Sequence, residues 1–597
     1  MFKKIFSLLL SLSIFMSLLA SCSDEPETVK TYDDKYRNFY EIYVRSFSDS
    51  NGDHIGDLNG VVSKLDYLKA AEGTDDSGSL GIDGVWLMPI FTSPSEHKYD
   101  VTDYYSIDPT YGTMEDFENL LSEFHERGIR VIVDLVLNHS SNEHPWFQQA
   151  VEALNAGEES KYIDYYTFTQ EPELDEWGSI TGYNPVEGNT EGYYYESRFS
   201  PSMPDLNLAN PEVIREIKDI MKFWIEKGVD GFRLDACKYY FYDDTAKNVE
   251  LLSTITEYCR SINPDFYLVG EVWDSDYVIS EYYKSGMDSF FNFDCSYKGA
   301  YQGLFNNIDT GNGELLAERA EYWNTTIRNN NLDAIDAPFL SNHDTIRSAS
   351  YFNDDTSNRK LAASLYMMLP GNTFIYYGEE IGMTQGWQND SYKRLPIKWS
   401  SEEDGTDITP PTGGKNIKAP FFSVEEQLED SNSLLNHYRT LIKLKNQNPE
   451  IQRAQVVSAC DLDNRNVSAY TCAYDGSSVM VLHNLTATVK QVDLKAAGYD
   501  DYTILRGFAT ASKYIAEEEY NAYLNDEEYE TPEFISGASP LTYVNGVLTL
   551  PPKTTVILKS SKSVDSTFIT TTTTAYVTPS DAVTSTDTET ESTDAVE

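Results

Sequence analysis

The chain has 597 residues, enough for two or three domains and a large buried core. Its 96 acidic residues against 45 basic ones give a formal net charge of −51, so the surface repels nucleic-acid phosphates and anionic lipids. This charge excludes nucleic acid as a partner and favours neutral substrates and cations. The 43 tyrosines suit surfaces that stack on sugar rings, although domain interfaces account for them equally well.

The N-terminus is predicted to be a targeting segment. Lys3 and Lys4 precede an apolar run over residues 5–19, too short for a membrane-spanning helix but typical of a signal peptide. The run ends in Leu-Ala-Ser-Cys at Cys22, which resembles the lipobox of bacterial lipoproteins. The alternative is a plain signal peptide with an incidental cysteine. We expect residues 1–21 to be a lipoprotein signal peptide and residues 22–35 an acidic tether. Lipid on Cys22 would then hold the protein to the membrane at the bacterial cell surface.

Five cysteines remain after Cys22. Cys237 and Cys259 lie in barrel-like segments and are expected to be small buried apolar residues. Cys460 and Cys472 fall in adjacent strand-like runs and could pair, but the odd count argues against a fold that depends on disulfides. No cysteine spacing indicates a zinc site.

Strand-like and helix-like segments alternate from about residue 39 to residue 445. Helical patterns are predicted at 114–127, 211–227 and 248–261. Eight strands alternating with helices predict an α/β fold, a (β/α)8 TIM barrel, whose functional side chains stand at the C-terminal ends of the strands. The candidate strands are 39–47, 84–89, 130–137, 231–234, 267–271, 289–293, 337–341 and 373–377.

One connection in this pattern is too long to be a structureless loop. Residues 139–204, rich in Tyr, Gly and Glu, are predicted to form an inserted domain after the third strand, so the barrel takes residues 36–138 and 205–447. Strand-like alternation then predicts a C-terminal antiparallel β-sandwich over residues 448–560, with the acidic stretch 516–533 as a surface excursion. The Thr/Ser/Asp-rich residues 561–597 are predicted to be disordered.

Polar side chains of catalytic type stand at the ends of strand-like runs. The segments 132–139, 231–238, 268–274, 339–344 and 203–207 bring three carboxylates, an arginine and two histidines to one pocket. Cleaving an acetal between two sugars needs little more than two well-placed carboxyl groups. Each carboxylate alone would suit a structural ion pair, but the joint pattern predicts a catalytic site.

These segments, in this order, resemble the ordered regions of the α-amylase family of glycoside hydrolases, and the resemblance covers residues 39–558. It implies that Asp235 is the nucleophile and Glu271 the general acid/base. Asp344 would be the third carboxylate, which binds sugar hydroxyls and distorts the ring. The chemistry agrees, because Arg233 beside Asp235 favours an ionised carboxylate. An aromatic setting beside Trp273, with like charges nearby, favours a protonated Glu271.

The resemblance also implies the residues that bind substrate. His139 and His343, each directly after an Asn, match the histidines that hydrogen-bond the sugar at the cleavage subsite, and Tyr99 matches the stacking tyrosine there. Asp134 would support the site through Arg233. The substrate-binding set is therefore Tyr99, His139, Arg233, Lys238 and His343, and Trp177, Trp387 and tyrosines 193–195 are candidate outer stacking platforms.

Two features bear on which bond is cut. Residues 203–207, Met-Pro-Asp-Leu-Asn, look like the group intermediate between oligo-1,6-glucosidases and neopullulanases. A lysine at the position of Lys238 binds the sugar on the leaving-group side in α-amylases and is generally missing from oligo-1,6-glucosidases, although it could also merely pair with an acid. We therefore expect a monomeric enzyme that cleaves α-1,4 bonds of starch-like glucans and maltooligosaccharides internally, with retention of configuration.

Three alternatives remain open. An exo-acting α-glucosidase or oligo-1,6-glucosidase would release glucose from the start. A transglycosylating relative such as a trehalose synthase would use the same carboxylates. A non-catalytic glucan-binding lipoprotein would be expected to have lost one of the three carboxylates, and Asp235, Glu271 and Asp344 are all present.

Residues 49–57 carry a second, independent signal. Oxygen-bearing side chains alternate along Asp-Ser-Asn-Gly-Asp-His-Ile-Gly-Asp, with glycines for a tight turn, which suits a hard cation such as Ca²⁺. The spacing resembles the calcium loop of the oligo-1,6-glucosidase-like branch. That resemblance implies the ligands Asp49, Asn51, Asp53, the Ile55 carbonyl and Asp57, with a structural role; the alternative is an Asp/Gly-rich turn without metal.

The other calcium ion of classical α-amylases is not predicted. Asn138 and Asp205 match two of its ligands, but Tyr239 stands where the family has a histidine. A phenol is a poor ligand for Ca²⁺.

Overall fold

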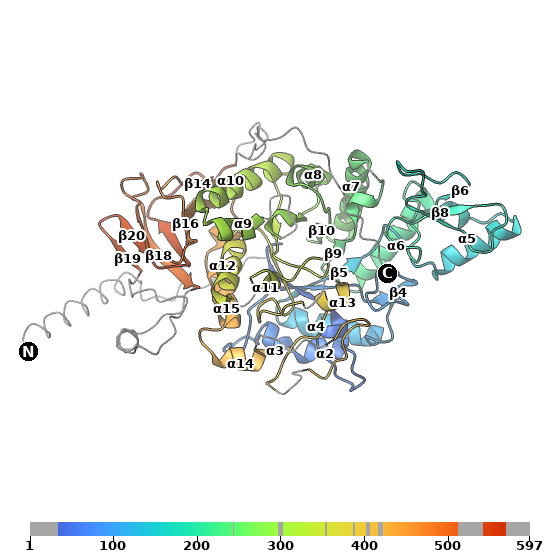
Figure 1. Cartoon of the computed structure of the whole chain (residues 1–597), viewed down its shortest axis with the longest axis horizontal. Helices are drawn as coiled ribbons and strands as arrows, with labels where there is room; N and C mark the ends of the chain where they lie inside the picture. The colour runs from blue at the N-terminus through green and yellow to red at the C-terminus, as the bar shows by residue number, and fades with distance from the viewer. Residues whose placement is uncertain are drawn as a thin grey trace, which may run out of the picture.

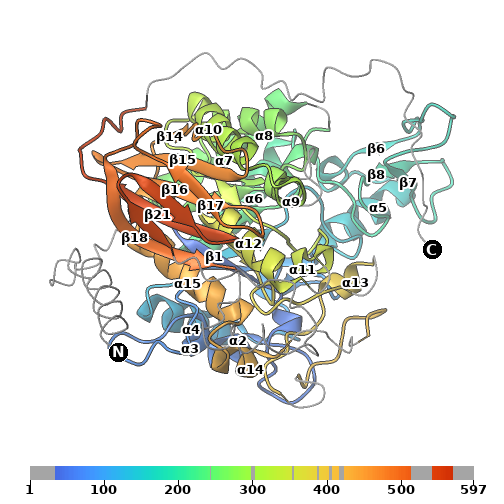
Figure 2. The ribbon, with the colours of Figure 1, turned by 60° about the vertical axis from the view of Figure 1, so that its left-hand side comes forward.

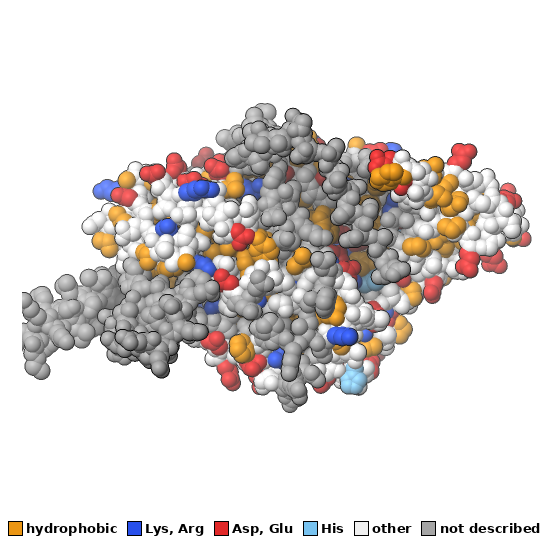
Figure 3. Space-filling view, in the orientation of Figure 1, with side chains coloured by type: hydrophobic (Ala, Val, Ile, Leu, Met, Phe, Trp, Pro, Cys, Tyr) orange, Lys and Arg blue, Asp and Glu red, His pale blue; other side chains and the backbone are white. Residues whose placement is uncertain are grey.

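The computed structural model describes residues 34–242, 244–296, 303–352, 355–385, 389–401, 406–415, 422–511 and 541–568. The predicted signal peptide, the acidic stretch 516–533 and Trp387 lie outside these residues, as do nearly all of the predicted tether and most of the tail. Among the described residues, no helix is both long and apolar enough to cross a membrane. Acidic side chains stand along the edges of the face shown in Figure 3, in keeping with the charge.

Eight parallel strands form a nearly closed barrel in the order β12-β11-β10-β9-β5-β2-β1-β13. The register is continuous, since Tyr40 lies opposite both Val85 and Ile375, and a bridge between Phe339 and Phe374 joins the two ends of the sheet. The predicted (β/α)8 fold is therefore confirmed. The barrel strands are β1 (Asn38–Ile42), β2 (Gly84–Leu87), β5 (Arg130–Leu135), β9 (Gly231–Leu234), β10 (Tyr267–Gly270), β11 (Ser289–Asn292), β12 (Ala337–Pro338) and β13 (Thr373–Tyr376).

Most strands end earlier than their apolar runs predict. β1 stops at Ile42, and the next residues form the 3-10 helix η1 (Val44–Ser46), although the run continues to residue 47. The apolar run extends past the end of the strand because Val44 and Phe47 are fully buried in the loop that follows β1. Apolar character alone does not separate a buried strand from a buried turn.

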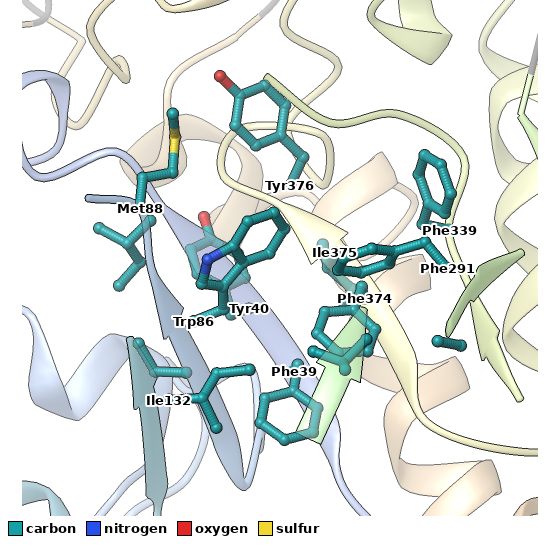
Figure 4. Close-up of a cluster of buried hydrophobic side chains, with 14 of the residues drawn as sticks. Phe39, Tyr40, Trp86, Met88, Ile132, Phe291, Phe339, Phe374, Ile375 and Tyr376 are labelled. Carbon is teal, nitrogen blue, oxygen red and sulfur yellow. The ribbon is translucent and has the colours of Figure 1, made fainter. Parts of the chain in front are cut away.

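Aromatic side chains fill the barrel interior (Figure 4). The ring of Phe39 stacks on that of Phe374 with centroids 4.7 Å apart, and Phe291 meets Phe374 edge-on at 5.0 Å. Trp86 packs against Phe291 at 5.3 Å and also against the imidazole of His343 at 5.6 Å. Trp86 therefore joins the hydrophobic core to the polar end of the barrel.

Helices surround the barrel, and their ends follow the local sequence. α4 starts with a reciprocal capping box between Thr113 and Asp116, and α6 starts with Pro211 after an Asn210 cap. They correspond to the predicted helices 114–127 and 211–227. The helices outside the inserted domain are α2 (Leu58–Ser63), α3 (Leu65–Leu68), α4 (Met114–Glu126), α6 (Pro211–Glu226), α7 (Thr245–Ile262), α8 (Asp276–Tyr282), α9 (Gly303–Thr310), α10 (Gly313–Asn330), α11 (Ser348–Tyr351), α12 (Thr356–Met367), α13 (Asp390–Lys393), α14 (Val424–Glu429), α15 (Leu434–Gln447) and α16 (Pro449–Gln452).

The long connection after β5 forms a small domain at the right-hand end of Figure 1. It contains the helix α5 (Pro145–Ala156) and an antiparallel sheet in the order β6-β8-β7. A bridge between His139 and Asp205 joins the two ends of this connection, and a bridge between Tyr166 and Leu206 joins its interior to the segment that follows it. Its strands are β6 (Phe168–Thr169), β7 (Tyr183–Pro185) and β8 (Tyr194–Glu196).

The C-terminal domain, orange and red in Figure 2, is an antiparallel sandwich of two sheets. Met480, Leu482 and Val556 of one sheet pack with Val492 and Leu548 of the other in a core separate from that of the barrel. The five cysteines in the described residues are unpaired, so Cys460 and Cys472 form no disulfide. The sheets are β14 (Val456–Ala459), β15 (Val467–Tyr474), β16 (Ser477–Asn484), β21 (Thr554–Ser560) and β18 (Tyr502–Thr510), and β17 (Lys490–Asp493), β20 (Val547–Leu550) and β19 (Thr542–Val544).

Candidate active site

Arg233 lies at the centre of a carboxylate cluster above the barrel. Its Nη1 atom lies 2.8 Å from Asp134 Oδ1 and 2.7 Å from Asp235 Oδ1, and its Nη2 lies 2.9 Å from Glu271 Oε2. These residues come from the ends of β5, β9 and β10, which are neighbours in the sheet. The guanidinium also lies over the Trp86 ring, 5.2 Å from its centroid. One buried arginine therefore contacts both Asp235 and Glu271. The sequence predicted its contact with Asp235 but not its contact with Glu271.

The backbone turns sharply after Asp235. Ala236 adopts a left-handed conformation with φ of 49°, and its N–H donates to Glu271 Oε2 at 3.1 Å. The turn fixes the position of Glu271 relative to Asp235. Burial raises the pKa of Glu271; Arg233 opposes this rise, and the charges of Asp235 and Asp344 reinforce it. A raised pKa suits a carboxyl group that must donate a proton.

Asp344 lies in a cationic environment. His343 Nε2 lies 2.9 Å from Asp344 Oδ2, and Arg394 Nη2 lies 2.9 Å from Oδ1. Burial raises the pKa of Asp344, but the charges and hydrogen bonds of His343 and Arg394 outweigh it and hold that pKa well below its usual range. Asp344 is therefore ionised and can accept hydrogen bonds from sugar hydroxyls, whereas the raised pKa of Glu271 favours its protonated form.

His343 is fully buried between carboxylates. Its Nδ1 lies 2.6 Å from Glu41 Oε1, and its Nε2 lies 2.7 Å from the Tyr99 hydroxyl. The Tyr99 hydroxyl donates to Asp134 Oδ2 at 3.0 Å, so its oxygen can accept from the imidazole. Burial lowers the pKa of His343, but Asp344 and Glu41 outweigh burial and raise it to about 9. His343 is thus a charged donor at neutral pH.

His139 has an unsatisfied nitrogen in the same pocket. It is buried, yet its Nε2 atom has no hydrogen-bond partner. The Tyr104 hydroxyl donates to its backbone carbonyl at 2.9 Å, and the Phe199 ring packs against the imidazole with centroids 5.4 Å apart. A buried polar nitrogen without a partner is costly, so a sugar hydroxyl is a fitting partner for it.

Lys238 lies at the rim rather than inside the cluster. Its ammonium pairs with Asp274 Oδ2 at 2.7 Å, and this pairing raises the pKa of Lys238. Both side chains are partly exposed. The sequence left open whether this lysine binds sugar or pairs with an acid, and in the structure it pairs with an acid three residues beyond Glu271.

Two residues of the cluster were not predicted. Glu41 lies within β1, next to its last residue, and is the only charged residue in that strand, so a buried charge in an otherwise uncharged strand could have revealed it. Arg394 follows helix α13, far along the loop after β13, and no local pattern connects it to Asp344. Only the folding of that loop back over the barrel brings the two together.

The predicted calcium loop is an exposed turn held by its own side chains. The backbone N–H of Asn51 donates to Asp49 Oδ1 at 2.9 Å, that of Asp53 to Asn51 Oδ1 at 2.8 Å, and that of Ile55 to Asp53 Oδ1 at 2.8 Å. Asp57 caps α2 by accepting from Gly60. The donor set consists of oxygen atoms on one turn, which fits a hard cation. Among the described residues, no group of three His, Cys, Asp or Glu side chains is arranged to hold a metal ion.

Asn138 and Asp205, which match two ligands of the other calcium ion of classical α-amylases, contact each other directly. The Asn138 amide donates to Asp205 Oδ1 at 3.0 Å, and burial raises the pKa of Asp205 to about 8. The Tyr239 ring packs on Phe199 at 4.9 Å instead of turning to a metal. The expectation that no ion binds there stays a prediction.

A (β/α)8 barrel that carries Asp235, Glu271 and Asp344 at the ends of its strands is the framework of a glycoside hydrolase. Comparison with known proteins identifies the family. The family model "Alpha amylase, catalytic domain" matches residues 41–454, so the chain belongs to the α-amylase family and is a glycoside hydrolase.

Relatives within the family differ in their named activities. "Alpha-amylase 3" of Dictyoglomus thermophilum is 44% identical over 454 residues, covering 75% of this chain and 85% of that protein. An oligo-1,6-glucosidase of Halalkalibacterium halodurans is 30% identical over 533 residues, covering 76% and 91%. The solved structure of Amy13B of Eubacterium rectale superposes with a TM-score of 0.77 at 35% identity, covering 89% of this chain and 97% of that one. The family is thus shown, while relatives of both activities match the chain.

Proposed function

We propose that this glycoside hydrolase cleaves α-1,4-glucosidic bonds of starch-like glucans internally and with retention of configuration. The observation that supports retention is the bridge by Arg233, whose neighbouring nitrogens contact Asp235 at 2.7 Å and Glu271 at 2.9 Å. Two carboxyl groups on one guanidinium are close, as retention requires; inverting enzymes keep them further apart to leave room for a water molecule.

Hydrolysis with retention proceeds in two steps, and each of the two carboxyl groups has a separate role in them. In the first, an Asp235 oxygen attacks the anomeric carbon while Glu271 gives its proton to the glycosidic oxygen, and the C–O bond to the leaving sugar breaks. In the second, ionised Glu271 takes a proton from water, whose oxygen replaces Asp235 at the anomeric carbon. Ionised Asp344, oriented by His343 and Arg394, accepts hydrogen bonds from sugar hydroxyls, and Nε2 of His139 hydrogen-bonds a further hydroxyl.

Lys238 supports internal cleavage. Asp274 holds its ammonium at 2.7 Å, at the rim beside the acid/base, where a sugar on the leaving-group side would pass. A lysine fixed there by an acid can still hydrogen-bond a hydroxyl, since an ammonium has three donors. The nearest alternative is an oligo-1,6-glucosidase, the named activity of several relatives.

Product analysis on amylose, pullulan and maltotriose tests this proposal. Oligosaccharides of intermediate length should appear early from amylose, with retained α-configuration at the new reducing end. Glucose as the sole early product would refute internal cleavage, and β-anomeric products would refute retention.

We further propose that Ca²⁺ binds the loop of residues 49–57 and that lipid on Cys22 holds the enzyme at the cell surface. The loop contacts a neighbouring segment, since His54 Nδ1 lies 2.7 Å from the Asp407 carbonyl and Thr409 N–H donates to the His54 carbonyl at 2.9 Å. An ion there would stabilise both segments. For the anchor, Cys22→Ala should abolish metabolic labelling with palmitate, and labelling that persists would refute it.

A further inference from the structure

A small cavity lies between the helices α9 and α10 and the strands β11 and β12 of the barrel. Its volume is about 40 Å³, room for roughly two or three water-sized spheres. Leu304, Leu316 and Trp323 contribute an apolar wall, and the residues that line it are separate from those of the candidate active site. Three asparagines and an aspartate also line it: Asn292 at the end of β11, Asn307 of α9, Asn324 of α10 and Asp336 directly before β12.

The side-chain oxygens of the three asparagines are unsatisfied. Asn307 is 2% exposed, Asn292 4% and Asn324 6%, yet the Oδ1 atom of each has no hydrogen-bond partner among the described residues. The orientation of two of the amides is fixed, because Nδ2 of Asn292 donates to Asp336 Oδ2 at 3.1 Å and Nδ2 of Asn307 donates to the Gly303 carbonyl at 3.3 Å. A buried acceptor without a partner costs free energy, so the three oxygens indicate a ligand in the cavity.

The charges around the cavity favour a cation with a single charge. Asp336 accepts hydrogen bonds from Asn292 and from the Ala337 N–H at 2.9 Å, but none of the salt bridges within the described part of the chain involves it. Arg319, the cation on the cavity wall, pairs with Asp294. The ammonium of the nearby Lys445 donates to the Leu369 carbonyl and the Thr373 hydroxyl. One carboxylate and three neutral amides therefore face the cavity without a salt bridge of their own.

A cation suits these groups better than water does. A hard cation binds oxygen acceptors, and amide and carboxylate oxygens can replace its shell of water. A single water molecule has two hydrogens to donate, fewer than the three amide oxygens need. Additional water molecules would bring further acceptors into a cavity that already has four acceptor groups on its wall.

We propose that this cavity binds a monovalent alkali cation, K⁺ or Na⁺, through the Oδ1 atoms of Asn292, Asn307 and Asn324 and the carboxylate of Asp336. These ligands come from two strands and two helices, so the ion connects α9 and α10 to the barrel. Phe293, directly after Asn292, stacks on Trp273 with ring centroids 4.8 Å apart, and Trp273 lies two residues beyond Glu271. The ion thus stabilises the wall of the barrel next to the carboxylate cluster.

Thermal unfolding of the full chain in KCl, NaCl and choline chloride, at equal ionic strength and fixed Ca²⁺ concentration, tests the site. The melting temperature should be a few degrees higher in K⁺ or Na⁺ than in choline, because the ion binds only the folded protein and choline is too large for the cavity. Asn307→Leu should abolish this difference, whereas Asn307→Asp, which keeps an oxygen at the site, should retain it. Asn38→Ala is the matched control, since Asn38 of β1 is also buried with an unsatisfied Oδ1 but does not line the cavity. The control should retain the difference.

Anomalous diffraction from wild-type crystals soaked in Tl⁺, a heavy substitute for K⁺, locates the ion directly. A peak inside the cavity, in contact with the three asparagine oxygens, supports the proposal. No peak there means that the cavity holds water only and overturns the proposal, whatever the melting temperatures are. Stabilisation by K⁺ or Na⁺ that Asn307→Leu retains in full also overturns it, because the ion would then bind elsewhere. The wild-type diffraction experiment decides the question even if Asn307→Leu does not fold.

Discussion

Replacing Glu271 with Gln tests the assignment of the acid/base most directly. A Gln amide oxygen can still accept from the Ala236 N–H, which donates to Glu271 Oε2 at 3.1 Å, and it can still lie beside Arg233 Nη2, which is 2.9 Å from that oxygen. The turn after Asp235 and the geometry of the nucleophile should therefore persist. What is lost is the proton that the raised pKa of Glu271 keeps available for the glycosidic oxygen.

The size of the fall in kcat/KM of Glu271→Gln depends on the leaving group of the substrate. General acid catalysis contributes about 10²- to 10⁴-fold, or about 3–5 kcal/mol of barrier, when the leaving group is a sugar alkoxide. Fluoride leaves without a proton, so the first step with α-maltosyl fluoride needs only Asp235. We expect Glu271→Gln to lower kcat/KM for maltohexaose by about 10²- to 10⁴-fold and that for the fluoride far less.

Steady-state kinetics with the two substrates, and mass spectrometry of the protein mixed with the fluoride, check this expectation. The variant should accumulate a covalent glycosyl-enzyme on Asp235, because the second step has lost its base. Asp235→Asn is the matched control and should lose activity toward both substrates. Equal losses for both substrates in Glu271→Gln, or full hydrolysis of maltohexaose, would refute the assignment.

Three further outcomes are expected. Lys238→Ala should raise the KM for amylose about tenfold, because the free energy of one charged hydrogen bond to the substrate corresponds to about that factor. An unchanged KM would show that Lys238 only pairs with Asp274. EDTA should lower the melting temperature by a few degrees, and Asp53→Ala should lower it similarly and remove the EDTA effect; two silent results would exclude a bound ion. The pKa of His343 is about 9 in the folded protein and about 6.5 in the unfolded chain. The protonated imidazole therefore contributes fully to the free energy of unfolding below pH 6.5, and this contribution is lost as the pH rises through 9. Glu41→Gln should flatten that decline in the free energy of unfolding, measured by urea titration at several pH values; an unaltered decline would contradict the role of Glu41.

The sequence by itself determined the barrel and the three carboxylates. Parallel strands bury both faces, so their apolar runs stand out between amphipathic helices, and polar residues directly after such runs must lie at one end of the barrel. Asp235 and Glu271 follow β9 and β10 in this way. Strand ends were less well predicted, as at β1, because a buried loop is as apolar as a strand.

Only the tertiary structure decided which partners surround these carboxylates. Arg394 reaches Asp344 across fifty positions, Arg233 bridges Glu271 as well as Asp235, and Phe199 of the inserted domain meets Tyr239 of the barrel. Such contacts depend on how loops fold over the strand ends, and loops carry no periodic pattern that predicts their course. Local sequence thus set the identity of the proposed catalytic groups, while long-range packing set the ion pairs and hydrogen bonds that surround them.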